Sequence, residues 1–200
     1  MAPLEQQPLR VLVANEDRGR LEEIAGTLSG LGHDVVAREI DVAEVAEAVT
    51  QVRPDMAVVG LHDHHADHAL GMIGEIIAEA ICPVIAVTDG DDPEFVQQAA
   101  ASGIFAYTSS FDEEALRGAM DIALRRFDHA VKLEAAIARR ALIERAKGVL
   151  MERYSIDDRA AFDMLRDQSR KSGKKVLAIS EALLESHALL RSPARPPDPR

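Results

Sequence analysis

Five short apolar runs, separated by stretches with helical spacing, restrict the fold of this 200-residue chain more than any other feature. Each run is apolar at consecutive positions, and each is bounded by polar residues, proline or glycine. Strands of this kind are buried on both faces, which requires helices on both sides of a parallel sheet. We therefore predict an α/β fold built on a five-stranded, doubly wound parallel sheet. The predicted strands are residues 11–13, 34–36, 56–59, 84–87 and 104–107.

In a doubly wound sheet, chemically active side chains gather where the strands end. Asn15, Glu16 and Asp17 follow the first predicted strand, Gly60 ends the third, and Thr88 follows the fourth. The runs RVLVANED, RPDMAVVGL, CPVIAVT and GIFAYTSSF resemble the receiver domain of bacterial response regulators over residues 9–125. The resemblance implies a receiver-like, flavodoxin-like sheet.

The resemblance also implies which residues stand at the receiver's phosphorylation site. The acidic pair that holds magnesium falls on Asn15 and Glu16, so one carboxylate is missing and Asp17 is at best a substitute. The phosphate-accepting aspartate falls on Gly60, which has no side chain to phosphorylate. The hydroxyl residue that follows the phosphate falls on Thr88. Asn15, Glu16, Asp17 and Thr88 would therefore form a remnant acidic pocket.

Two further receiver positions complete this interpretation. The aromatic switch residue falls on Tyr107, whereas the lysine of the fifth strand has no counterpart, because the first lysine of the chain is Lys132. An acyl phosphate needs a carboxylate nucleophile, a divalent cation and a pairing cation. We therefore predict a pseudo-receiver that does not accept phosphate and is controlled by a regulatory protein, a small ligand or changed dimerisation. Asp63 is an alternative acceptor, but the extra loop residues after Gly60 would move it off the sheet end.

The loop after the third strand is rich in histidine, because residues 62–68 read HDHHADH. Imidazoles and carboxylates at this density can bind zinc or nickel, although a solvated polar loop explains the composition equally well. No metal or other cofactor is assigned, and a metal- or ligand-sensing adaptor acting through the His62–His68 loop stays an alternative function. Cys82 precedes a buried strand and is interpreted as a small core residue. No catalytic set stands out, so we do not expect an enzyme.

A long helix is predicted from Asp112 onward, because proline does not recur before Pro193. Apolar residues at its start are spaced close to a heptad pattern. We interpret residues 112–138 as a coiled-coil connecting helix of a parallel homodimer. The alternative is a fifth receiver helix that packs on its own sheet and extends beyond it. The predicted dimer seam consists of Leu116, Met120, Leu124, Phe127 and Val131.

Residues 139–190 carry more lysine and arginine than aspartate and glutamate, in a chain whose net charge is −11. Their apolar spacing predicts three short amphipathic helices, with Ser155 and Asp158 as a capping box and Gly173 ending the second helix. An acidic chain repels phosphates, so any binding of a polyanion must be local. A basic corner of this kind can pair with phosphates, although a solvated charged face is the plainer explanation.

The runs RALIERAKGVLMER (140–153), AAF (160–162) and MLR (164–166) resemble the ANTAR domain, an RNA-binding module of bacterial transcription antiterminators, over about residues 134–188. The resemblance implies a regulator of the two-component type that binds paired hairpins in nascent mRNA and so acts indirectly on RNA polymerase. We assign Gly148 to close helix approach, Ala161 and Leu165 to packing, and Tyr154 to base stacking. The predicted RNA-binding residues are Lys147, Arg166, Arg170, Lys171, Lys174 and Lys175.

A DNA-binding response regulator is the main competing function. It would need a recognition helix with side chains that read bases, whereas the third predicted helix of the module is mostly Ala, Leu, Glu and Ser. A single cysteine, no apolar run long enough to span a bilayer and no secretion signal at the start favour the cytoplasm and no membrane partner. Residues 191–200 hold several prolines and are predicted to be a disordered tail.

Overall fold

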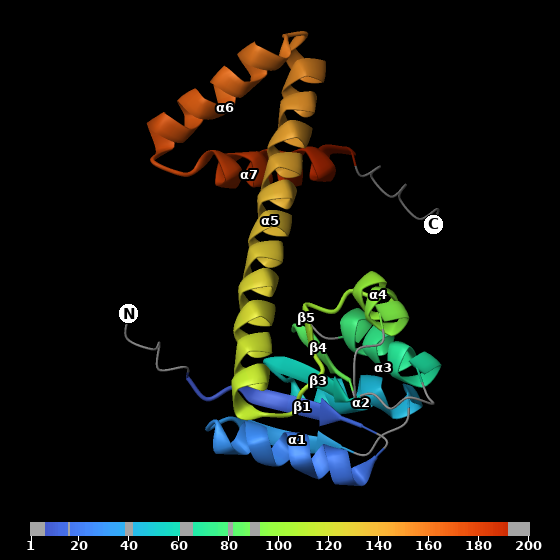
Figure 1. Cartoon of the computed structure of the whole chain (residues 1–200). Coiled ribbons are helices and arrows are strands. Elements are labelled where there is room, and N and C mark those ends of the chain that lie inside the picture. Colours follow the sequence, from blue (N-terminus) through green and yellow to red (C-terminus); the bar gives the residue numbers. More distant parts are fainter. Residues whose placement is uncertain are drawn as a thin grey trace, which may run out of the picture. The chain divides into compact units, whose positions relative to one another are not determined.

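The computed structural model describes residues 7–15, 17–38, 42–60, 66–79, 82–88 and 93–191, and for some residues of strand β2 and of helices α2, α3 and α7 it describes the backbone alone. The chain divides into two compact units, residues 1–129 and 130–200, and helix α5 (Glu113–Tyr154) contributes to both. Figure 1 shows the elements of each unit in chain order. None of the helices in the described ranges combines the length and the apolar character needed to cross a bilayer.

The first unit contains the predicted parallel sheet. Its strands are β1 (Arg10–Ala14), β2 (Asp34–Arg38), β3 (Met56–Gly60), β4 (Val84–Val87) and β5 (Ala106–Thr108), in the order β2-β1-β3-β4-β5. All four pairings are parallel, which confirms the predicted fold class. The fifth strand begins later than predicted, because Gly103 has a φ of 100° and the Ile104 amide still donates to the Ala99 carbonyl at the end of the preceding helix.

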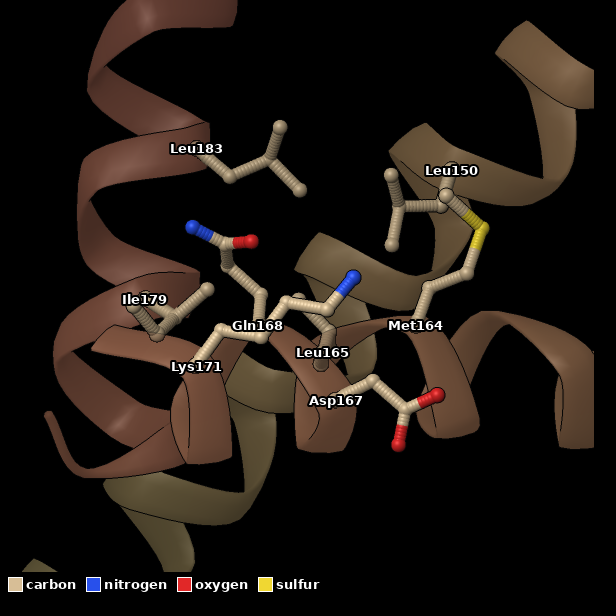
Figure 2. A pocket seen from close by; sticks show the side chains of 8 residues that line it. All are labelled: Leu150, Met164, Leu165, Asp167, Gln168, Lys171, Ile179 and Leu183. Carbon is tan, nitrogen blue, oxygen red and sulfur yellow. The ribbon is translucent and has the colours of Figure 1, made fainter. Parts of the chain in front are cut away.

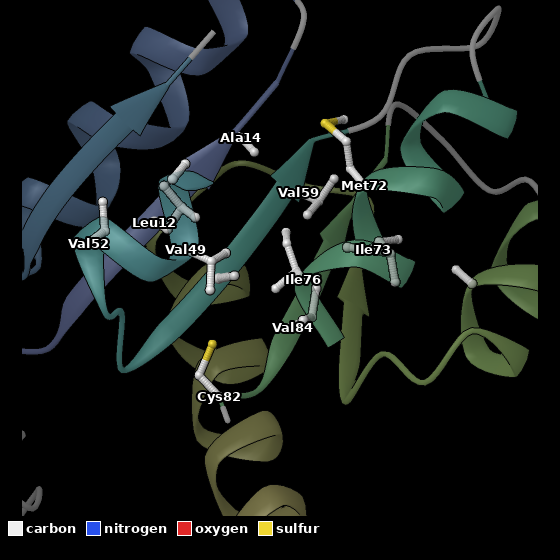
Figure 3. Packing of buried hydrophobic residues seen from close by; sticks show 14 of the residues in the cluster. Leu12, Ala14, Val49, Val52, Val59, Met72, Ile73, Ile76, Cys82 and Val84 are labelled. Atoms are coloured by element: carbon white, nitrogen blue, oxygen red, sulfur yellow. The ribbon is translucent and has the colours of Figure 1, made fainter. Parts of the chain in front are cut away.

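Helices cover both faces of this sheet, as continuous apolar strands require. Alternate residues of the strands enter one apolar layer with α2 (Val42–Val52), α3 (Ala66–Glu79) and α4 (Pro93–Ala101), and Figure 3 shows part of this layer. The other residues of the strands enter a second layer with α1 (Arg18–Gly30) and α5. Both layers are mainly aliphatic, with Phe95 buried in the first, and together they bury both faces of the sheet.

The start of α5 packs against the sheet of its own unit, which makes part of the predicted dimer seam wrong. Leu116 and Met120 are 0% and 1% exposed and belong to the layer that α1 covers. Leu124 packs against the same layer, and the Phe127 ring meets the Phe105 ring edge to face at 5.3 Å between centroids. Full burial of a Leu or Met side chain contributes roughly 1.5–3 kcal/mol to folding. Turning these side chains toward a second helix would remove that contribution.

The second unit is a small three-helix module formed by the end of α5, α6 (Asp158–Ser172) and α7 (Val176–Arg191). Its core holds the fully buried Ala161 and the nearly buried Leu165, in agreement with the packing role predicted for both. Gly173 ends α6 with a φ of 68°, as predicted. The cap at the start of α6 is Asp157 rather than Ser155, because the Asp157 Oδ1 accepts the Ala160 amide at 2.7 Å.

Candidate functional site

The carboxyl edge of the sheet brings together Asn15 and Thr88, two residues of the predicted remnant pocket, and Gly60, the predicted phosphoacceptor position. Asn15 and Thr88 are 2% and 4% exposed, and Gly60 is the last residue of β3, paired in register with Val87. Because neighbouring parallel strands end at the same edge, Asn15, Gly60 and Thr88 lie on one side of the sheet. Glu16 lies outside the described residues.

The side chain of Asn15 occupies the space that a side chain at position 60 would need. A Cβ added to Gly60 would lie 2.1 Å from Asn15 Nδ2 and 3.0 Å from Asn15 Cγ, with Ile24 Cδ1 at 3.2 Å. The backbone amide of Asp17 donates to Asn15 Oδ1 at 2.7 Å, which fixes how the Asn15 side chain is turned. Gly60 is therefore matched to Asn15 sterically, besides lacking a group to phosphorylate.

Two observations set this edge apart from a metal-binding centre. The carboxylate of Asp17 caps α1, because its Oδ1 accepts the Arg20 amide at 3.0 Å. Nδ2 of Asn15 is buried and has no hydrogen-bond partner within the described parts of the chain. A buried amide donor without a partner is costly, and it repels a cation in its neighbourhood.

The metal-binding alternative falls largely on residues that cannot be described. Residues 61–65, including Asp63, lie outside the described residues, and so do the side chains of positions 66–68. Elsewhere in the described ranges, no three His, Cys, Asp or Glu side chains are grouped so that they could hold a metal ion. Of the predicted tail at residues 191–200, Arg191 is instead the last residue of α7, and residues 192–200 lie outside the described residues.

Cys82 has the structural role expected of it. It is 4% exposed and packs in the layer covered by α2, α3 and α4. Burial, and to a smaller degree the negative charge of Asp55, raises the pKa of the Cys82 thiol to about 11. Such a thiol stays protonated near neutral pH and is a poor nucleophile.

Lys147, the first of the predicted RNA-binding residues, is held inside the second unit. Its side chain is only 9% exposed, and its Nζ lies 2.7 Å from Glu144 Oε2 and 2.5 Å from Asp158 Oδ1. Hydrogen bonds to Asp158 and Glu144 raise the pKa of Lys147. The ammonium group thus joins α5 to the first turn of α6 and is not available to a phosphate. The RNA-binding assignment of Lys147 is therefore corrected to a structural one.

Gly148, the next residue, also differs from its predicted role. It is exposed, and a Cβ added there would meet nothing within 4 Å. No neighbouring helix in the described part of the chain needs glycine at this position. The structure gives no reason for glycine here.

The remaining predicted cations gather where α6 turns into α7. Arg166 Nη2 lies 2.7 Å from Asp163 Oδ1, and Arg170 Nη1 lies 3.7 Å from Asp167 Oδ1. Both pairs are well exposed to solvent, so each contributes little to stability. Either arginine can therefore give up its aspartate partner and bind a phosphate instead. The remaining three, Lys171, Lys174 and Lys175, are exposed and have no ion-pair partner among the described residues. We call these three residues the lysine corner.

The structure adds an aromatic residue that the sequence reasoning did not single out. Phe162 on α6 is 40% exposed. Its spacing places it on the helical face that also carries Arg159, Arg166 and Arg170. Tyr154, predicted to stack on bases, is 52% exposed and lies 5.9 Å from the Arg153 guanidinium. An aromatic residue spaced one helical turn from several arginines was the signal that could have identified Phe162.

Comparison with known families assigns this module. Residues 131–184 match the family model of the ANTAR domain. The chain carries an ANTAR domain. The matched residues span the end of α5, all of α6 and most of α7, so the lysine corner and both arginine pairs belong to the ANTAR domain.

Known proteins resemble the chain over its length and over its receiver fold. The transcriptional regulatory protein PdtaR of Mycobacterium tuberculosis is 25% identical over 187 residues, covering 90% of this chain and 91% of PdtaR. The signal receiver domain of a modulated diguanylate cyclase from Desulfovibrio desulfuricans matches 62% of this chain and 99% of its own, with 22% identity and a TM-score of 0.55. The chemotaxis protein CheY4 of Vibrio cholerae matches 58% and 99%, with 16% identity and a TM-score of 0.51. The chain thus combines a receiver fold with an ANTAR domain, as an ANTAR response regulator does.

Proposed function

We propose that this chain is a transcription antitermination regulator whose ANTAR domain binds hairpins in nascent mRNA. The observation that carries the proposal is the lysine corner: three exposed ammonium groups with no ion-pair partner among the described residues, in a chain of net charge −11. Cations without a protein partner are free to replace the counterions of a phosphate backbone, whereas the rest of the acidic chain repels it. The ANTAR match and the similarity to a transcriptional regulatory protein support this reading.

A gel-shift measurement tests this function directly. The full chain is titrated against a hairpin RNA and against duplex DNA of the same length, each at two salt concentrations. We expect binding of the hairpin at both, weaker at high salt because phosphate contacts release counterions. Tighter binding of the duplex at both salt concentrations would favour a DNA-binding regulator and contradict the proposal.

We further propose that the receiver fold acts without phosphorylation. The steric match between Gly60 and Asn15 supports this proposal, because it leaves neither a carboxylate nor the room for one at the end of β3. Incubation of the chain with acetyl phosphate and Mg²⁺, followed by intact-mass measurement, should show no added phosphoryl group. A stable adduct would contradict the proposal and would direct attention to Asp63.

We also propose that two copies pair through the part of α5 that belongs to the second unit. Leu133 and Ile137 are 55% and 61% exposed, and they share a helical face with Ala130 and Ala141. Val131, the one exposed residue of the predicted seam at 41%, lies on a different face. Sedimentation velocity should give a dimer for the unmodified chain.

A pair of charge substitutions tests this pairing. Ile137→Glu should give a monomer, because a charge would replace an apolar group in the shared stripe. Ala138→Glu, which is about 100° round the helix, serves as the matched control and should stay dimeric. A monomeric unmodified chain would contradict the proposal.

A further inference from the structure

A pocket of about 350 Å³ opens inside the ANTAR domain, between the end of α5, α6 and α7 (Figure 2). Its volume falls within the range of about 300–1,000 Å³ that is typical of small-ligand sites, and native cores contain few voids larger than a water molecule. The lining consists of Leu150 from α5, Met164, Leu165, Asp167, Gln168 and Lys171 from α6, and Ile179 and Leu183 from α7.

The floor of the pocket is aliphatic and fixed. Leu150 and Leu165 are 6% and 2% exposed and belong to the core of the domain. Ile179 and Leu183 pack against the same core from α7. Met164, at 41% exposed, is the flexible part of the lining, and its thioether can adjust to a flat ligand. The floor therefore suits a planar group with apolar faces.

The mouth of the pocket carries polar groups without protein partners. In Figure 2 the Gln168 amide lies toward Ile179 and Leu183, and the Lys171 ammonium extends across the pocket toward Met164 and Leu150. Neither side chain has a hydrogen-bonding or ion-pair partner among the described residues. An amide offers two donors and an acceptor, which is the complement of the edge of a nucleobase.

We propose that this pocket accepts one unpaired nucleobase of a hairpin loop, turned out of the base stack. Aliphatic side chains would cover its faces, the Gln168 amide would read its edge, and Lys171 would pair with an adjoining phosphate. Loops of RNA present unstacked bases of this kind, and their flat faces are held by apolar as well as aromatic side chains.

Charge favours a nucleotide over an uncharged ligand or a side chain of a second copy, because Lys171 has no ion-pair partner among the described residues, whereas the Asp167 carboxylate of the lining lies 3.7 Å from Arg170 Nη1. Lys171 belongs both to the pocket and to the lysine corner, so a strand that follows the corner passes the mouth of the pocket. An uncharged ligand would leave the Lys171 ammonium without a partner. The inference rests on the proposed RNA binding, and it adds where a base is bound and by which residues.

The test uses a hairpin RNA selected on the unmodified full chain from a library with a randomised loop. Loop nucleotides are then made abasic one at a time, which removes the base and keeps the phosphate. We expect one loop position at which the abasic change weakens binding by about tenfold, as is typical for one well-contacted base. An equal affinity for every abasic RNA would overturn the inference.

Two variants connect that position with the pocket. Met164→Trp fills the pocket from its rim, and Gln168→Leu keeps the apolar volume but removes the polar edge. In Met164→Trp the abasic RNA and the intact RNA should bind equally, because the base can no longer enter. Gln168→Leu should bind all four bases at the sensitive position with similar affinity. Ala182→Trp, at an exposed position of α7 outside the pocket, is the matched control and should behave as the unmodified chain.

The outcomes separate this inference from the function on which it rests. An abasic penalty of the same size in Met164→Trp, in a variant with an unchanged melting curve, would overturn the pocket assignment while RNA binding stands. A change in oligomeric state in Met164→Trp, with the same penalty, would make the pocket a contact between copies and equally overturn it. If no selected hairpin binds the unmodified chain, both the proposed function and the inference are contradicted.

Discussion

The carboxyl edge of the sheet and the lysine corner differ in their suitability for a phosphate: the first lacks space for a phosphorylated side chain, and the second carries exposed cations. At the sheet edge, Asn15 and Gly60 fill each other's space and leave neither a nucleophile nor room for one. At the corner between α6 and α7, Lys171, Lys174 and Lys175 are exposed and unpaired within the described chain. Within the described residues, the first region has a receiver fold with a glycine at the end of β3, where we propose that no phosphoryl group is accepted. The second has cations whose charge is balanced by no ion pair with a described residue.

The contrast shows how charged residues bear on ligand binding in this chain. The number of basic residues says little, because the ammonium group of Lys147 is nearly buried and is already paired with Glu144 and Asp158. What matters is which charged groups lack a protein partner or have only an exposed one, since these gain most from a ligand. Four sets of substitutions test the two regions.

The largest effect is expected from removing the lysine corner. In the triple variant Lys171→Ala, Lys174→Ala, Lys175→Ala, hairpin affinity should fall about a hundredfold at low salt. The slope of log affinity against log salt concentration should also become less steep, by the amount expected for the loss of up to about three phosphate contacts. Gel shifts over a salt series measure both quantities. The chain should fold as before, because the three side chains make no ion pairs with described residues.

A charge-matched control accompanies the triple variant. Arg18→Ala, Arg117→Ala and Arg125→Ala together remove the same charge from exposed ion pairs of the first unit. This variant should bind the hairpin as the unmodified chain does. If both triple variants lose affinity equally, long-range charge rather than the corner governs binding.

The next effect tests the opposite region. Gly60→Ala should destabilise the chain by about 1–3 kcal/mol, because its Cβ would overlap Asn15 Nδ2 at 2.1 Å. In an Asn15→Ala background the same substitution should cost much less, giving a coupling free energy of about 1 kcal/mol or more. Urea unfolding of the full chain, followed by circular dichroism, measures the four members of this cycle. Additive costs would show that Asn15 does not fill the space beside Gly60.

The sheet could be predicted from sequence, because buried parallel strands are apolar at consecutive positions and leave a clear pattern. The dimer seam could not be predicted from sequence. In a helix that packs on its own sheet, apolar residues recur at the same spacings of three and four as in a coiled coil. Leu116 and Met120 satisfy both patterns, and only the core they enter separates them. Which face of a helix is already covered is a property of the fold and not of the spacing.

The candidate sites also combine features that the sequence predicts with features that depend on the fold. The resemblance to receivers predicts that Gly60 occupies the phosphoacceptor position. It does not predict that Gly60 lies against Asn15, because these two residues come together only through the pairing of their strands. The pairing of Lys147 with Asp158 was hidden likewise, since it depends on how α6 folds back on α5. The exposed lysines were predictable because a short polar turn between two helices cannot bury them.

A smaller effect is expected at Lys147, and it should appear in stability rather than in RNA recognition. Lys147→Met should lower the melting temperature of the second unit, because the ammonium links Glu144 to Asp158. Hairpin affinity of the folded protein should change less than in the lysine-corner variant. Lys147→Arg, which keeps the charge, should recover part of the stability.

The pH dependence of this ion pair follows from the direction of its pKa shift. The pKa of Lys147 is raised above 10.5 by its two hydrogen-bonded carboxylates. Its contribution is therefore complete below 10.5 and is lost as the pH rises through the folded-state pKa. The difference in melting temperature between the unmodified chain and Lys147→Met should stay constant from pH 7 to about pH 10 and shrink above it. A difference that shrinks already below pH 9 would contradict this role.

The smallest effect is expected from two aspartates, one in each compact unit. Asp17 and Asp157 both cap helices, accepting the amides of Arg20 and Ala160 at 3.0 and 2.7 Å. Replacing either by Ala should cost about 0.5–2 kcal/mol, whereas Asn keeps most of the cap, so Asp17→Asn and Asp157→Asn should be close to neutral. Thermal melts of the four variants measure these costs. If Asp17 instead held a divalent cation, Mg²⁺ would stabilise the unmodified chain and not Asp17→Asn, since a metal site is lost with its carboxylate. Equal melting temperatures with and without Mg²⁺ in both proteins are expected, because the Asp17 carboxylate is committed to the start of α1.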